Sequence, residues 1–173
     1  PDLMIPVLSE ISPLLMDYYI CMGYPLKRSS LYSLFELIFK AQLSAKDGRY
    51  YTRDYLKVLR HPFIKNLRLY SDMTVTRILV HKIEEVITGK ERSAISGSLF
   101  IKPDDIRELD DIYALASEML KRLDIKAGRR ELEAVLAQIH DLLFAQWEAI
   151  ENFGDFAVAL DKFLAILVDK SVL

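Results

Sequence analysis

Apolar residues recur every three or four positions along most of this chain, the spacing of helices that bury one side. The strongest such run lies between residues 132 and 150, and Gly154 follows it as a predicted stop. Asp155 is then the predicted cap of a last helix. We expect these two helices to form the core through their apolar sides, with Leu136, Ile139, Leu143 and Trp147 against Phe163 and Leu164.

Polar caps and helix breakers divide the preceding residues into further predicted helices. The predicted helix starts are Ser29 or Ser30, Thr52, Ser71 or Asp72, and Pro103, and the predicted stops are residues 47–48, Pro62, Gly89 and Gly128. A helix over residues 103–119 is expected to be continuous, and residues 90–102 are expected to be a loop.

One short segment, residues 18–22, has the β-prone sequence Tyr-Tyr-Ile-Cys-Met and no helical period. The predicted fold class is therefore mainly α: an irregular multi-helix domain of six or seven helices with one short β segment near residues 18–22. A single strand cannot satisfy its own backbone hydrogen-bonding groups, so we expect it either to pair with a segment outside this chain or to lie as an irregular edge.

Composition limits the class of protein. Apolar residues make up 51% of the 173 residues, enough for a sizeable core, and the net charge of −2 gives no bulk attraction to nucleic acid or anionic membranes. A single cysteine, Cys21, excludes an intramolecular disulfide, and no apolar run approaches the roughly 20 residues that span a bilayer. We therefore expect a cytoplasmic protein without membrane contact.

Because the chain opens at Pro1 and neither end resembles a natural tail, we interpret it as a piece of a larger protein.

Recognisable catalytic and cofactor motifs are missing from the sequence. There is no glycine-rich phosphate loop, and no histidine or cysteine pair has metal-ligand spacing. Cys21 is expected to be a buried small hydrophobe. We predict no catalytic residue, no metal site, no cofactor and no small-molecule substrate, because an independent enzyme would need a pocket of convergent titratable groups.

One pattern imitates a nuclease motif. Pro103-Asp104 followed by Asp124-Ile125-Lys126 matches the order PD…DxK, whose two carboxylates and lysine converge on a divalent cation in some nucleases. Here the residues flank a helical pattern, and Asp104 follows a proline at a helix start. The favoured interpretation is a helix first turn enriched in acidic residues.

A local excess of positive charge is the clearest candidate for binding. Arg49, Arg53, Lys57 and Arg60 are spaced by four, four and three residues, so a helix would place them on one face. Only Asp54 opposes the six cations between residues 49 and 70, and tyrosines and a phenylalanine are interleaved with them. Such a stripe suits DNA phosphates, and the alternative is a solvated helix face.

Two segments carry a resemblance to a known family. Residues 16–43, MDYYICMGYPLKRSSLYSLFELIFKAQL, and residues 51–64, which contain LRHP, resemble blocks of UvrD-type superfamily 1 helicases and more closely AddB-type helicase–exonucleases. The likeness covers about residues 2–66. It implies that residues 1–28 lead from a helicase-like core and that residues 29–173 form a helical accessory (2B-type) domain.

The resemblance implies a parent protein that processes DNA in repair or recombination, with its ATPase and nuclease motifs outside this chain. The expected role is then non-catalytic: positioning or contacting DNA, with DNA and the rest of the parent chain as partners. A generic helical protein–protein interaction domain is the alternative.

Overall fold

The structure, a computed structural model, describes residues 25–171 and is mainly helical, as predicted. The predicted β segment at residues 18–22 and Cys21 lie outside the described residues. The elements in order are the 3-10 turn η2 Leu26–Arg28, α2 Ser30–Ser44, β1 Tyr50–Tyr51, α3 Thr52–Arg60, α4 Pro62–Lys65, α5 Met73–Ile87, β2 Phe100–Ile101, α6 Pro103–Arg107, α7 Asp110–Arg122, α8 Arg129–His140, the π turn η3 Asp141–Ala145, α9 Gln146–Glu148 and α10 Phe153–Lys170.

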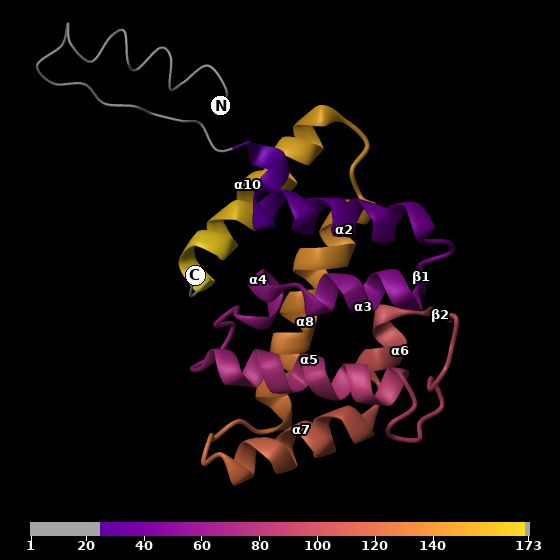
Figure 1. The fold of residues 1–173 in the computed structure, drawn as a ribbon, viewed down its shortest axis with the longest axis vertical. Coiled ribbons are helices and arrows are strands. Elements are labelled where there is room, and N and C mark those ends of the chain that lie inside the picture. The colour runs from indigo at the N-terminus through magenta and orange to yellow at the C-terminus, as the bar shows by residue number, and fades with distance from the viewer. Residues whose placement is uncertain (1–24, 172–173) are drawn as a thin grey trace, which may run out of the picture.

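Helices α2, α3, α5 and α7 lie one below another like rungs, and α8 runs across them (Figure 1). The core lies between these elements, since the inner faces of α2, α3, α5, α7 and α8 are buried. Trp147 is 5% exposed, and its ring centroid lies 5.6 Å from that of Phe163 on α10. The predicted packing of the 132–150 segment against the last helix is confirmed, although Leu164 is only half-buried.

Several predicted caps are confirmed. The Ser29 hydroxyl accepts a hydrogen bond from the Tyr32 amide at the start of α2, and Asp72 accepts one from the Thr74 amide at the start of α5. Pro62 separates α3 from α4, because the residue before a proline resists the helical conformation.

Other predicted boundaries were wrong. The expected helix over residues 103–119 is two helices, because Leu109 is extended and Asp110 begins a new first turn. The segment after α8 widens into a π turn and ends at Glu148. Asn152, rather than Asp155, caps α10 by accepting hydrogen bonds from the amides of residues 154 and 155.

The one sheet among the described residues is a two-stranded antiparallel ribbon, in which Tyr50 faces Ile101 and Tyr51 faces Phe100. It joins the segment between α2 and α3 to the region predicted to be a loop. Side chains alternate across a ribbon, so Tyr50 and Ile101 are buried while Tyr51 and Phe100 lie on the outer face.

Candidate nucleic-acid interface

A tight turn places two cations opposite each other just before β1. Lys46 and Arg49 exchange both backbone N–H···O bonds at 2.9 Å, and the turn residues Asp47 and Gly48 have φ values of 53° and 67°. Positive φ at both positions defines the type I′ turn that Asp-Gly favours. Directly opposed residues project to the same side, so this turn places two cationic side chains next to each other, with the Asp47 carboxylate in the same turn.

The ribbon beside this turn is held firmly. The Tyr50 hydroxyl donates a hydrogen bond to Glu148, and its ring centroid lies 4.8 Å from that of Phe144. Burial, with the Glu148 hydrogen bond, raises the pKa of Tyr50, which therefore stays neutral. The Thr52 amide donates to the Leu99 carbonyl at 3.0 Å, and the Thr52 hydroxyl donates to the Ser98 carbonyl at 2.6 Å. Thr52 is thus the first residue of α3 and not its cap, and it fastens the two strands together.

A first depression of about 410 Å³ lies on one side of the ribbon, lined by Lys46, Asp47, Arg49, Phe100 and Lys102. Three of these five side chains are cationic and one is a carboxylate. Lys102 is more than fifty residues from Arg49 in the sequence, and the pairing of β1 with β2 brings the two together.

A second depression of about 490 Å³ contains the other three residues of the predicted basic stripe. Arg53, Lys57 and Arg60 line it, so the prediction that α3 places them on one face is confirmed. Its remaining lining residues are uncharged and come from β1, α3, the end of α5 and the segment before β2.

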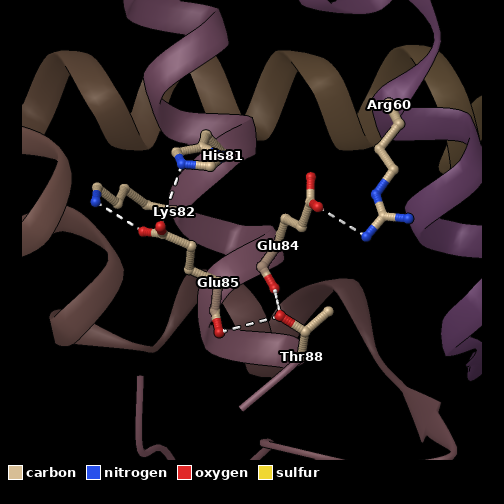
Figure 2. A network of polar contacts seen from close by, with 6 residues as sticks. All are labelled: Arg60, His81, Lys82, Glu84, Glu85 and Thr88. Atoms are coloured by element: carbon tan, nitrogen blue, oxygen red, sulfur yellow. Dashed lines mark hydrogen bonds and ion pairs between the residues drawn. The ribbon is translucent and has the colours of Figure 1, made fainter. Parts of the chain in front are cut away.

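Two of these three cations already have carboxylate partners. The Lys57 ammonium lies 3.6 Å from a carboxylate oxygen of Asp54, and the Arg60 guanidinium lies 2.8 Å from one of Glu84. Figure 2 shows the Arg60 contact beside a second network on α5, in which Glu85 meets both His81 and Lys82. The Lys82 hydrogen bond, followed by smaller charge effects, holds the pKa of Glu85 below its usual range.

The structure therefore divides the four cations of the predicted basic stripe between two depressions. Arg49 precedes α3, and it lines the first depression and not the second. Sequence reasoning missed Lys46 and Lys102. The Asp-Gly turn was a usable signal for Lys46, whereas nothing local in the sequence pointed to Lys102. Among the described residues, Lys46, Arg49, Arg53 and Lys102 have no carboxylate within ion-pair distance.

The nuclease-like pattern is not assembled in this structure. Asp104 lies in the first turn of α6, as expected, and lines a depression beside α8. Asp124 and Lys126 line a different depression between α7 and α8. Within residues 25–171 no three His, Cys, Asp or Glu side chains are placed to hold a metal ion.

The three histidines are also separate. His61 contacts the Ser33 hydroxyl at 3.0 Å, exposed His81 contacts Glu85 at 3.2 Å, and buried His140 contacts the Tyr55 hydroxyl at 2.7 Å. Burial lowers the pKa of His61 and, with a smaller effect of Arg107, lowers the pKa of His140 to about 3. The three rings have different partners and do not form a common site.

Comparison with known proteins gives no family assignment: no family model, curated protein or solved structure matches the chain. In the part of the chain that the structure describes, none of the helices has the length and apolar character needed to cross a bilayer. The geometry around the ribbon is therefore the main basis for a functional argument.

Proposed function

We propose that this chain is a non-catalytic helical part of a DNA-processing protein of the helicase–exonuclease type, and that it contacts the DNA backbone. The contact surface is the basic ribbon surface, formed by Lys46, Arg49, Arg53 and Lys102 around β1 and β2. The sequence resemblance supports the kind of parent protein. The observation that carries DNA contact is the gathering of these unpaired cations, from three separate segments, around one rigid ribbon.

Electrostatics support this surface over the one expected from the sequence. The two depressions together are lined by six cations and a single carboxylate, Asp47. Cations already paired with carboxylates, such as Lys57 and Arg60, must give up those contacts to bind phosphate. Lys46 and Arg49 have no such carboxylate contact among the described residues, so a phosphate can bind them without displacing one.

The expected affinity is modest. The whole chain carries a net charge of −2, so attraction is confined to this surface and is weakened by the acidic remainder. Contacts to phosphates carry no sequence information and depend steeply on salt, by about 0.9 in the slope of log K against log salt per contact on duplex DNA. Binding should therefore be largely independent of sequence and lost at high salt.

The test compares two charge-matched double variants of the chain. Arg53→Glu with Lys102→Glu removes two cations of the basic ribbon surface. Arg130→Glu with Lys126→Glu makes the same charge change at exposed positions near the start of α8. Duplex binding is measured at several salt concentrations, and circular dichroism checks that both variants fold.

The first variant should bind more weakly and lower the salt slope by about 2, since two phosphate contacts are lost. The second should keep the wild-type slope. Equal effects of the two variants would show that only net charge matters, and the proposed surface would be wrong.

One observation favours the alternative function, a protein-interaction domain. The outer face of α10 exposes Phe153, Val158 and Val168, at 92%, 71% and 85%. Exposed apolar side chains gathered on one element are typical of protein contacts, and the resemblance would make the rest of the parent chain the partner. Val158→Ser with Val168→Ser should then abolish association with the parent protein's remaining segments and leave DNA binding unchanged.

A further inference from the structure

We infer that the basic ribbon surface receives single-stranded DNA, with an unpaired base stacked on Phe100 and the flanking phosphates held by the neighbouring cations. This inference rests on the proposed DNA contact and specifies the form of DNA. Its basis is an aromatic pair on the ribbon, Tyr51 and Phe100, which phosphate contact alone does not require.

The outer face of the ribbon carries that pair. Phe100 is 45% exposed, and its ring centroid lies 5.8 Å from that of half-buried Tyr51, with the rings tilted by 55°. Leu99 beside them is 62% exposed. Folding alone gains little from leaving a phenylalanine ring so accessible in the middle of a charged surface, since its apolar area stays in water.

The strand that carries the Phe100 ring is held in place by the face behind it. Tyr50 and Ile101, the inward neighbours of the aromatic pair, are buried, and the two Thr52 hydrogen bonds fix the end of the ribbon. The Ser96 hydroxyl and the Gly97 amide also bond to carbonyls at the end of α5, at 2.8 and 3.0 Å. The backbone that carries Phe100 is therefore ordered before binding, which lowers the entropic cost of binding at this strand.

Each ring of this pair lines a depression that also contains cations. Phe100 lines the first depression together with Lys46, Arg49 and Lys102, and Tyr51 lines the second together with Arg53. A strand of nucleic acid that lies across the ribbon can therefore contact the aromatic pair and the cations of both depressions. The ribbon has two residues per strand, so it has room for about one or two bases.

Of the two forms of DNA, only an unpaired strand uses all of these features. In a duplex the faces of the bases are covered by stacking, so the exposed ring gains nothing from a duplex. Stacking of a base on an aromatic side chain contributes about 1–3 kcal/mol, and it is tolerant of sequence. An acidic peptide would satisfy the cations but would not need the ring.

The test separates stacking from charge. Phe100→Leu keeps an apolar side chain on the ribbon and removes the ring, and Phe153→Leu is the control because that ring is 92% exposed at the start of α10. The full chain is titrated, at low salt, into an oligothymidine, an abasic strand of the same length, a duplex of the same length and polyglutamate.

Phe100→Leu should weaken oligothymidine binding by roughly 5- to 150-fold, the fold-change that corresponds to about 1–3 kcal/mol. Binding to the abasic strand and the duplex should stay unchanged, and Phe153→Leu should match the wild type with every probe.

Three outcomes would overturn the inference: no effect of Phe100→Leu on oligothymidine, an equal effect on all DNA probes, or polyglutamate binding as tight and as dependent on Phe100 as oligothymidine binding. The Arg53→Glu, Lys102→Glu variant distinguishes phosphate contact from base stacking. If it weakens binding while Phe100→Leu does not, phosphate contact stands and stacking is wrong. If neither variant changes binding, the proposed function fails as well.

Discussion

Buried His140 should make the fold sensitive to mild acid. Its side chain is 4% exposed, its Nε2 lies 2.7 Å from the Tyr55 hydroxyl oxygen, and its Nδ1 has no hydrogen-bond partner among the described residues. A proton added to this ring would place a charge on a residue that is almost completely removed from water. Burial accordingly lowers the pKa of His140 to about 3, and the nearby Arg107 guanidinium adds to the shift.

The size of the effect follows from the difference between the folded and unfolded pKa. The pKa of an unfolded histidine is about 6.5. Between that pH and about pH 3, therefore, only the unfolded state takes up the proton. The stability linked to neutral His140 is fully present above about pH 6.5 and is lost as the pH falls. The slope approaches about 1.4 kcal/mol per pH unit, which amounts to about 2 kcal/mol by about pH 5.

Urea unfolding between about pH 7 and about pH 5 measures this loss in a range where few carboxylates titrate. The comparison is with His140→Gln, whose side chain stays neutral and can still accept a hydrogen bond from Tyr55. The variant should be less stable at neutral pH but should lose less stability toward pH 5, with a residual slope from His61, whose pKa is also lowered by burial. The reasoning is refuted if the wild type is equally stable at both pH values, or if the two proteins have the same slope.

Three further predictions concern charge, turn and core. Glu84→Gln should release Arg60, strengthen duplex binding and raise the salt slope toward one additional contact, with little change in thermal stability because exposed ion pairs contribute only about 0–1 kcal/mol. Gly48→Ala should lower the free energy of unfolding by about 1 kcal/mol because φ at this position is 67°, and Gly48→Asn, which tolerates this conformation, should lose less in the same urea titration. Trp147→Ala should lower the free energy of unfolding by about 3–5 kcal/mol, as measured by chemical unfolding. Trp147→Phe should lower it clearly less, because this change mainly removes the indole hydrogen bond to the Leu142 carbonyl.

Much of the helical fold could be predicted because its signals are local. The burial of Trp147 against Phe163 follows from apolar residues at helical spacing on two segments, and the caps at Ser29 and Asp72 follow from side chains beside the first turn. Boundaries failed where two local signals competed. Both Asn152 and Asp155 are good caps, and only the structure shows that Asn152 takes the role.

The candidate site was only partly predictable because it depends on contacts between distant segments. The strands of the ribbon are two residues long, too short to show an alternating pattern, and they join positions about fifty residues apart. Lys102 therefore entered the site only through the pairing of β1 with β2. The partner of Arg60, Glu84, likewise lies on another helix, so the loss of this cation to an ion pair had no local signal in the sequence.

Stability and binding make opposite demands on the basic ribbon surface. Elsewhere on its surface this fold pairs opposite charges, as Arg129 does with Asp110 and Glu133. At the turn before β1 it instead sets Lys46 and Arg49 directly opposite each other, with an Asp-Gly pair that fixes their separation. The adjoining ribbon then adds Lys102 and an exposed Phe100 to the same depression. The Asp-Gly turn stabilises the chain, but the unpaired cations and the exposed ring are available to a ligand, and together they favour a polyanion with exposed rings, such as single-stranded DNA.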